Sequence, residues 1–503
     1  MSTIVAEKKQ QFQEIIAKID AYREALSIMY WDLRTGAPRK GAEMRSQSIG
    51  VLSTDVFKLR VSDEMGACLD VLNAHEEELD APLRKMVKDM TKDYNQSKLI
   101  PPDLYQEYIV LTSNAETIWE EAKAKQDYEM FKPYLRDVVR ITQQFINYWG
   151  VKDTRYDTLL DMYEPGLTVA ELDKTFSKLK DQLVPLVKQV QEADHVPESG
   201  FLKQTFSIEK QKQFSHYILK EMGFDFDAGR LDESVHPFQT TINQRDTRIT
   251  THYMEQDAAS AVFSALHEGG HALYEQNINK EFAQTPLSQG TSMGIHESQS
   301  RLWENLVGRS LPFWKHYFPE LQKTFNGQFD DVTPEQFYRA INQVQPSLIR
   351  TDADEVTYNL HIIIRYEIEK MLFNENLSVD DLPRVWNEKY ESYLGIRPPH
   401  DGVGVLQDVH WSGGMFGYFP SYSLGNMYSA QMMHKMREVM PNVDDLIGSG
   451  DLLPIKEWLT EHVYQYGKLL TPSEVIERMT GEALNPQYLV DYLTEKTKDV
   501  YQL

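Results

Sequence analysis

Apolar residues recur at three- and four-residue spacings along most of the chain, which is the period of an α-helix with one buried face. The clearest case predicts a long helix over residues 8–31, and the run Thr35-Gly36-Ala37-Pro38 predicts where it stops. Its apolar positions are Phe12, Ile15, Ile16, Ile19, Tyr22, Leu26 and Met29. Alternation with a period of two is scarce. The pattern therefore predicts a mostly α-helical protein.

Helix-end signals place further elements. A helix is predicted over residues 133–149, with Pro133 in its first turn and Gly150 after its end. Thr168 and Glu171 have the spacing of a capping box ahead of another apolar stripe, in which Pro185 is expected to produce a kink. One strand-like run, residues 247–253, is rich in β-branched side chains.

The chain has neither an internal repeat nor a low-complexity linker. We therefore expect one large helical body over residues 1–503, with a cleft walled by the helices of about residues 1–150. The strand-like run lies only a few positions before a histidine-bearing helix.

Composition limits the class of protein. The chain has 503 residues, of which 41% are hydrophobic and 25% charged, and no run approaches the roughly 18 apolar residues of a membrane span. Charged residues start directly after the first few positions, which predicts a cytoplasmic protein without an apolar leader. The formal charge of −24 disfavours nucleic acid and anionic membranes as partners. Cys68 is the single cysteine, so a metal would have to be held by histidines and carboxylates.

Residues 264–276, SALHEGGHALYEQ, contain the motif His-Glu-x-x-His. On a helix, His267 and His271 lie one turn apart on the same face and can reach one metal ion, with Glu268 beside it as a general base. The alternative is a chance occurrence on a buried helix. Gly269 and Gly270 cost a helix interior about 1 kcal/mol each relative to alanine, which suggests that a backbone or a substrate approaches closely there.

A catalytic zinc site needs a third protein ligand and an open position for water. Glu297 and Glu304 both follow on the next predicted helix. We favour Glu297, because Ser298 and Gln299 beside it can form hydrogen bonds around a ligand, whereas Glu304 has Trp303 as its neighbour.

Six short motifs occur in order between residues 236 and 411, and together they resemble those of the carboxypeptidase Taq family. They are HPF from His236, DTRIT from Asp246, HEGGH from His267, HESQ from His296, IRTDAD from Ile349 and GVLQDVHW from Gly404. The overall length also fits that family.

The resemblance implies a cytosolic zinc metallocarboxypeptidase that releases residues from peptide C-termini with broad specificity and disfavours proline. It also implies a homodimer and a fold similar to neurolysin and angiotensin-converting enzyme, with a deep groove and a small sheet. The catalytic motifs would span residues 236–422. One zinc ion per chain is expected, with cobalt as a possible substitute.

Developing negative charge on the scissile carbonyl requires a second electrophile besides the metal. His410 and Tyr422 are donors of the right type, and similarity to the fold relatives assigns both to this role. The alternative for Tyr422 is core packing in an aromatic-rich turn.

An exopeptidase must also bind the free C-terminal carboxylate, for which a guanidinium is well suited. Arg350 is the first candidate, and its alternative is an ion pair with Asp352 or Asp354. Arg248 is the second candidate and could equally be the partner of Asp246. His236 is expected near the substrate.

Two other functions remain open from the residues. One is an endo-oligopeptidase on the same scaffold, which would hydrolyse peptides with blocked C-termini as readily as free ones. The other is a peptide-binding protein without activity, in which the metal is structural. Structural zinc sites use four protein ligands, and the sequence offers three convincing ones.

Overall fold

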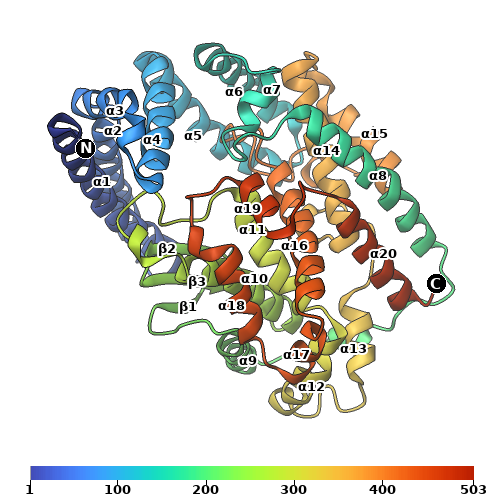
Figure 1. The fold of residues 1–503 in the computed structure, drawn as a ribbon. Helices are drawn as coiled ribbons and strands as arrows, with labels where there is room; N and C mark the ends of the chain where they lie inside the picture. Colours follow the sequence, from blue (N-terminus) through green and yellow to red (C-terminus); the bar gives the residue numbers. More distant parts are fainter. Residues whose placement is uncertain (1) are drawn as a thin grey trace.

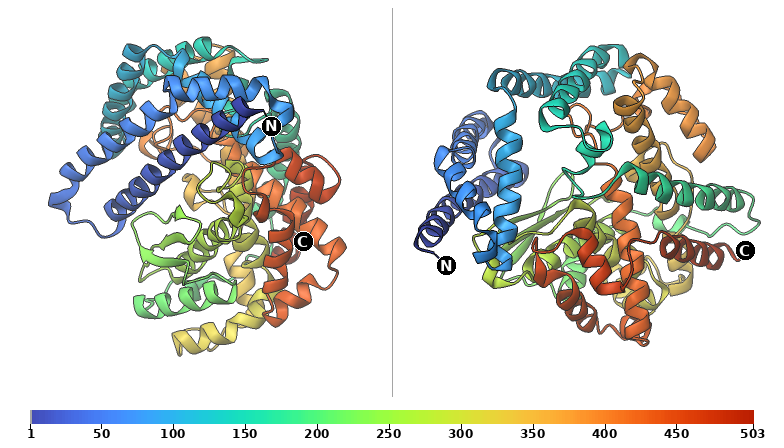
Figure 2. Two further views of the ribbon diagram at one scale, coloured as in Figure 1. Left: turned by 60° about the vertical axis from the view of Figure 1, so that its left-hand side comes forward. Right: turned by 45° about the horizontal axis from the view of Figure 1, so that its top comes forward.

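The computed structural model describes residues 2–503 and is helical apart from one small sheet (Figure 1). The predicted first helix is confirmed: it extends through Thr35, and Gly36 is its C-cap. It belongs to a series of N-terminal helices along one side of the molecule (Figures 1 and 2). These are α1 Thr3–Thr35, α2 Ala42–Arg60, α3 Asp63–Ala74, α4 Ala81–Leu99, α5 Pro102–Lys125 and α6 Tyr128–Trp149.

The predicted start of α6 at residue 133 is wrong. The helix begins at Tyr128, where the side chain of Asp127 accepts a hydrogen bond from the backbone of Glu129, and Pro133 lies inside it. Tyr128 and Phe131 are both buried. Burying two aromatic side chains contributes about 1.5–3 kcal/mol each, which offsets the roughly 3 kcal/mol cost of an internal proline.

Helix α8 confirms the capping box. The Thr168 side chain accepts from the backbone of Glu171, and the Glu171 side chain accepts from the backbone of Thr168. The helix continues through Pro185 to Gln191, with Leu183 and Leu186 buried on either side. The capping box thus determines where α8 begins. Burial of its apolar face stabilises the helix enough for it to continue beyond Pro185.

The sheet contains three strands, β1 Gly229–Glu233, β2 Gln239–Asn243 and β3 Asp246–Thr251, in the order β1-β3-β2. The predicted strand is confirmed as β3, which is the central strand and pairs in parallel with β1 and antiparallel with β2. Its buried face contacts the histidine-bearing helix α10, Ala258–Gln276. Strand β2 is left as an edge strand of the sheet.

Four helices in the middle of the molecule position the candidate site. Helix α11, Met293–Arg301, packs between α10 and α16, Pro420–Val439, and continues into a π-helical turn η5, Leu302–Val307. Helix α14, Glu355–Asn374, packs against α16.

The other helices surround this centre. The α-helices are α7 Arg155–Leu160, α8 Val169–Gln191, α9 Ile208–Glu221, α12 Leu311–Phe325, α13 Pro334–Ile341, α15 Leu382–Leu394, α17 Val443–Ser449, α18 Leu453–His462, α19 Pro472–Thr480 and α20 Gln487–Tyr501. Short 3₁₀ turns are η1 Arg39–Gly41, η2 Glu76–Glu78, η3 Gly200–Leu202, η4 Lys280–Phe282, η6 Arg350–Asp352, η7 Val379–Asp381, η8 Asp401–Val403 and η9 Tyr464–Tyr466. Within residues 2–503, none of the helices has the length and apolar character needed to cross a membrane.

Glycines let α10, α11 and α16 approach one another closely. A Cβ atom at Gly270 would lie 2.5 Å from the carbonyl oxygen of Gln299 and 2.8 Å from Cα of Ser300. A Cβ atom at Gly425 on α16 would lie 2.5 Å from Cγ of Glu297. The expectation that a backbone approaches the glycine pair is confirmed for Gly270.

We predict that Gly270→Ala destabilises the protein. The methyl group meets backbone that cannot move aside, which costs about 1–3 kcal/mol and exceeds the roughly 1 kcal/mol gained from helix propensity. Thermal unfolding of the metal-free protein measures the effect. The matched control is Gly50→Ala in α2, where a Cβ atom meets nothing within 4 Å. That variant should unfold at a slightly higher temperature, and equal shifts in both variants would contradict the close-packing argument.

Candidate metal centre and substrate cleft

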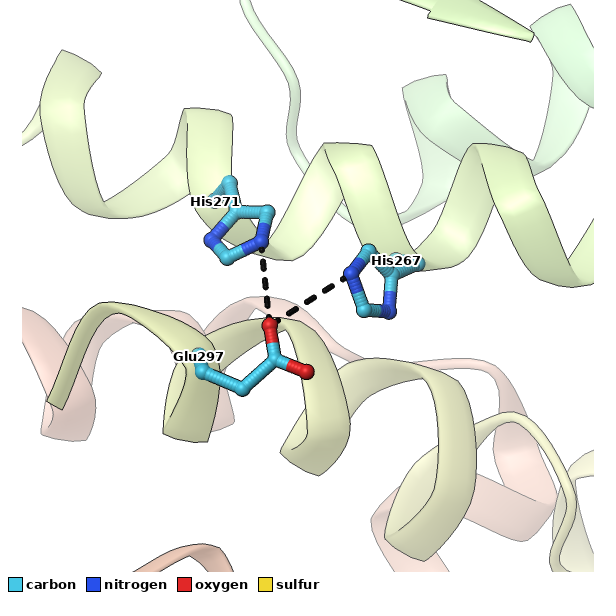
Figure 3. A group of neighbouring side chains, drawn as sticks. All are labelled: His267, His271 and Glu297. Carbon is cyan, nitrogen blue, oxygen red and sulfur yellow. Dashed lines mark ion pairs between the residues drawn. The ribbon is translucent and has the colours of Figure 1, made fainter. Parts of the chain in front are cut away.

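Three side chains converge between α10 and α11. The Nε2 atoms of His267 and His271 lie 3.6 Å and 3.4 Å from the same carboxylate oxygen of Glu297 (Figure 3). One ligand atom from each residue can be chosen so that all lie within 4.8 Å of one another. Two imidazoles and one carboxylate are a donor set that suits a metal ion with an open coordination position. The structure thus brings together the three ligands that the sequence predicts.

Glu304 is an outer partner of this group and not a member of it. Its Oε2 lies 2.9 Å from Nδ1 of His267, and its Oε1 accepts a hydrogen bond from Arg309 at 3.2 Å. Because a carboxylate only accepts hydrogen bonds, the proton of a neutral His267 sits on Nδ1. The lone pair of Nε2 is therefore free to bind a metal ion. The π-helical turn η5 carries Glu304 toward His267.

A second chain of contacts acts on His271. Its Nδ1 lies 2.6 Å from Nδ1 of His296, and Nε2 of His296 lies 2.9 Å from Oε1 of Glu275. With Glu275 accepting from Nε2–H, the Nδ1 atom of His296 must accept from His271. The free lone pair of His271 is then again on Nε2. Burial and the nearby His296 lower the pKa of His271 to about 3, which keeps it in the neutral, metal-binding form.

Sequence reasoning missed Glu275 and gave His296 no role. A signal for Glu275 was present, because it lies four residues after His271 and therefore on the same face of the helix. Glu275 is buried and also accepts hydrogen bonds from the backbone of Gly290 and the hydroxyl of Thr241. These contacts tie the loop after α10 and the edge strand β2 to the metal-ligand helix.

Glu297 is held by neighbours other than those expected. Arg301 donates to its Oε1 at 2.7 Å and Ser300 donates to its Oε2 at 3.0 Å. The hydroxyl of Ser298 and the amide of Gln299 instead contact the sulfur of Met432 on α16. The reason given for preferring Glu297 is thus wrong, although its carboxylate does lie with the two histidines. Burial would raise the pKa of Glu297, but Arg301 and the two histidines hold it well below its usual range.

Glu268 lines the cleft beside this group, and its side-chain carboxylate makes no hydrogen bond to another residue in the described part of the chain. Its residue is only 7% exposed. Burial raises its pKa to about 7, against the opposing effect of His267 and with a further rise from Glu297. A carboxylate with a pKa near neutrality is suited to accept and return a proton.

The cleft has a volume of about 650 Å³. Its walls come from the edge strand β2, the loop over residues 289–293, the start of α16 and Lys468. A neighbouring cavity of about 700 Å³ shares Thr241, Glu275 and Gln289 with the cleft and is lined on its other side by α1. Helix α1 therefore lines the neighbouring cavity, whereas no residue from 2 to 150 is among those that line the cleft itself.

Tyr422 faces the cleft and His410 lies behind it. Tyr422 is among the lining residues, whereas His410 is not, and Nε2 of His410 lies 3.2 Å from the Tyr422 hydroxyl. Burial raises the pKa of Tyr422 well above its usual value, so it keeps its proton. Burial also lowers the pKa of His410 to about 4 and keeps it neutral. Tyr418, which sequence reasoning missed although it lies four residues before Tyr422, lines the same wall.

The segment that carries these residues is attached to α14 by a buried carboxylate. Glu369 accepts hydrogen bonds from the indole of Trp411 at 2.7 Å, the backbone of Gly417 at 2.8 Å and the hydroxyl of Tyr156 at 2.6 Å. Burial raises the pKa of Glu369 to about 7, although all of these donors act to lower it. The residue fixes both sides of the turn that leads from His410 to Tyr422.

Arg350 has a different partner from those considered. Its Nε and Nη2 donate to Asp408 at 2.9 Å and 2.8 Å, and Nη1 donates to the hydroxyl of Tyr358 at 3.1 Å. The predicted alternative of an ion pair with Asp352 or Asp354 is not found for this residue. Arg350 does not line the cleft, and its guanidinium carbon lies 4.9 Å from the ring centre of Tyr422. It therefore adjoins the cleft through Tyr422.

Arg248 and His236 lie outside the lining of the cleft. Arg248 pairs with Asp246 through two hydrogen bonds of 2.7 Å and 2.6 Å, and it stacks over Trp31 of α1. His236 is exposed. Neither residue lines the cleft, whereas Phe238 from the same HPF motif does.

The site has a helix with the His-Glu-x-x-His motif, a carboxylate from the next helix and an adjacent cleft. This combination is typical of metal-dependent peptidases. The profile of the carboxypeptidase Taq (M32) metallopeptidase family matches residues 11–497. The chain is 50% identical to Carboxypeptidase 1 of Bacillus subtilis, over 98% of this chain and 99% of that protein. It is 39% identical to Thermostable carboxypeptidase 1 of Thermus thermophilus, over 96% of each chain.

Solved structures agree with these relatives. An M32 carboxypeptidase from Deinococcus radiodurans matches with a TM-score of 0.96 at 37% identity, over 99% of this chain and 100% of that one. A Pyrococcus furiosus carboxypeptidase matches with a TM-score of 0.95 at 35% identity, over 99% of each chain. The protein belongs to the carboxypeptidase Taq (M32) family and is a metallocarboxypeptidase.

We predict different metal affinities for variants of the two glutamates. Glu297→Ala removes a ligand and should abolish stoichiometric binding, whereas Glu304→Ala removes only the acceptor for His267 and should weaken binding about 10- to 100-fold. Titration of the metal-free protein against a chelator of known affinity measures both. Weaker binding in Glu304→Ala than in Glu297→Ala would contradict the assignment of the third ligand.

Proposed function

We propose that the protein is a zinc-dependent carboxypeptidase that releases C-terminal residues from peptides with broad specificity and disfavours proline, with Glu268 as the general base. The observation that carries this proposal is the position of Glu268. It is the one carboxylate of the cleft wall, within residues 2–503, that lies beside the His267, His271 and Glu297 group without a hydrogen-bond partner. A base in this position needs no rearrangement before it acts.

Zinc on His267, His271 and Glu297 would polarise the scissile carbonyl and lower the pKa of a bound water toward about 7. The residues of the chain have separate tasks. Glu268 accepts the proton of the attacking water and returns it to the leaving amine. Glu304 and His296 hold the two imidazoles with Nε2 toward the ligand position. Cobalt, which accepts the same donors, is a possible substitute for zinc.

Tyr422 is the proposed hydrogen-bond donor to the developing oxyanion. When His410 donates from Nε2 to the Tyr422 oxygen, the phenolic proton is free to point into the cleft. His410 then acts as a positioning residue, and Glu369 holds the turn that carries both. The raised pKa of Tyr422 supports this role, because the hydroxyl keeps its proton near neutral pH.

Arg350 is the proposed binder of the substrate's C-terminal carboxylate. Asp408 and Tyr358 occupy three of its five N–H groups. The remaining two N–H groups can donate to a ligand if Tyr422 and the adjoining wall leave room for that ligand beside Arg350. Arg248 is the second candidate, although both of its terminal contacts are directed at Asp246. His236 is proposed to contact the substrate beyond the cleft, next to Phe238.

Two alternatives make different demands on the same site. An endo-oligopeptidase would not distinguish free from blocked C-termini. A structural metal would call for four protein ligands, and the cluster within the described residues contains three. The unpartnered Glu268 also favours catalysis over a structural role. We further infer a cytoplasmic homodimer that acts on peptides and not on nucleic acid or membranes, consistent with the charge of −24.

We predict that Glu268→Gln abolishes turnover while metal content and the unfolding temperature stay nearly unchanged, because the variant loses the base and keeps every ligand. Activity on a short peptide, metal analysis and thermal unfolding together test this expectation. Substantial residual activity in a fully metal-loaded variant would refute the proposed base.

The proposed role of Arg350 predicts a selective loss. Arg350→Ala should reduce kcat/KM at least about tenfold on a peptide with a free C-terminus, because truncating one partner of a desolvated pair costs about 2–5 kcal/mol. The loss on the amidated peptide should be much smaller. The ratio of the two efficiencies is the decisive measurement, since a general loss of folded enzyme cancels in it.

Arg350→Lys and Arg248→Ala complete the comparison. Lysine should restore the ratio only in part, because an ammonium cannot form two parallel hydrogen bonds. A ratio that changes in Arg248→Ala and not in Arg350→Ala would transfer the role to Arg248. If neither variant changes the ratio, the endo-oligopeptidase is the better account.

A further inference from the structure

A short segment after η9 lies along the wall of the cleft. The backbone N–H of Lys468 donates to the carbonyl of Leu287 at 3.1 Å, and the hydroxyl of Thr291 donates to the carbonyl of Leu470. Gly467 has a φ of +47°, and a Cβ atom there would lie 2.3 Å from the Leu287 carbonyl oxygen. Only glycine fits this turn. The backbone of Lys468 is therefore fixed against the loop that leads to α11.

Lys468 is distinct among the charged residues of the cleft. Apart from tyrosines, the other titratable side chains of the cleft lining are histidines and glutamates. They are His267, Glu268, His271, Glu275, His296 and Glu297. No other lysine or arginine of the described chain lines the cleft, and the Lys468 ammonium forms no hydrogen bond or ion pair within residues 2–503. The cleft lining thus includes one unpaired ammonium, on a residue whose backbone is held in place.

The surrounding charges do not neutralise Lys468. Among the acidic groups, Asp89 and Asp93 on α4 raise the pKa of Lys468 most. Asp89 already pairs with Lys85 at 2.6 Å, and Asp93 pairs with Arg60 at 2.7 Å. Burial lowers the pKa of Lys468 by more than these carboxylates raise it. A partly desolvated ammonium without a partner gains from pairing with a carboxylate, because part of its hydration is already lost.

We propose that Lys468 is a specificity residue that pairs with the side-chain carboxylate of an aspartate or glutamate in the bound peptide. This proposal rests on peptide hydrolysis in this cleft. A side chain suits Lys468 better than the terminal carboxylate does, since a single compact ammonium on a flexible stem offers no paired geometry. The net charge of −24 otherwise repels acidic peptides, so this contact would let the enzyme accept them.

The test uses a set of short peptides with free C-termini, in which glutamate and glutamine are compared at each position in turn. The ratio of kcat/KM for the glutamate and glutamine peptides is measured for the wild type, Lys468→Met and Lys468→Arg. In the wild type, the ratio should be highest at one position. Lys468→Met should lower that ratio about tenfold, mainly through KM, and Lys468→Arg should retain most of it.

The matched control is Lys280→Met, which removes the same charge from an exposed residue of the neighbouring cavity. Its ratios should equal those of the wild type at every position. The wild-type preference should also fall with added salt, because dissolved ions screen a charge pair that is not fully buried. If Lys468 had only a structural role, Lys468→Met would change neither the position dependence nor the salt dependence of the glutamate-to-glutamine ratio.

Two outcomes would overturn the proposal. One is a glutamate-to-glutamine ratio that Lys468→Met leaves unchanged at all positions. The other is a change confined to the comparison of free with amidated C-termini, which would make Lys468 a binder of the terminal carboxylate. Failure of the proposed function is distinguishable from both, because the wild type would then release no C-terminal residue from the glutamine peptides.

Discussion

The metal centre depends on the close contact between α10 and α11. Two of the three residues that could hold a metal ion are on one helix and the third is on the other, so the distance between the two backbones decides whether three donor atoms can share an ion. Gly270 removes the side chain that would hold the helices apart, and Gly425 does the same for α16 on the far side of α11. Both glycines have a lower helix propensity than alanine, but they allow the neighbouring helices to lie close together. Helix α11 is therefore packed closely on both sides, at Gln299 and Ser300 against Gly270 and at Glu297 against Gly425.

Buried charges around the ligands are arranged so that nearly every one has a partner. Arg301 contacts both Glu297 and Glu304, and Arg309 contacts Glu304 from the other side. In a buried network, loss of one member leaves another charge unpaired, which is costly. The exceptions face the cleft: Glu268 and Lys468 have no partner among the described residues. The groups left free are thus those that a substrate or a reacting water can reach.

The opposite wall is held by a separate set of buried carboxylates. Asp408 lies between Arg350 and Arg365, and Glu369 binds the turn at Trp411 and Gly417. The turn between His410 and Tyr422 also has short-range backbone hydrogen bonds of its own, such as the one from the N–H of Met415 to the carbonyl of His410. These anchors keep Tyr422 at the cleft surface with His410 behind it. On both sides of the cleft, a buried charge with several hydrogen bonds thus lies next to residues that line the cleft.

The sequence by itself determined the features that depend on neighbours along the chain. These include α1, the capping box of α8, strand β3 and the pair of histidines one turn apart, since each arises from local periodicity or local hydrogen bonding. The start of α6 was wrong because burial of Tyr128 and Phe131 outweighs the local effect of Pro133. Motif resemblance, more than spacing, indicated the family.

Only the tertiary structure decided between groups whose roles depend on distant partners. It separated Glu297 from Glu304 through the packing of α11 on α10, and it paired Arg350 with Asp408, 58 residues away, where local sequence had suggested Asp352 or Asp354. It also showed that Tyr422 faces the cleft and His410 does not, and it revealed Lys468, which no motif marks. The physical reason is the same in each case: whether a charged or polar side chain is paired, buried or exposed to a cleft is set by helices that meet only when the chain has folded.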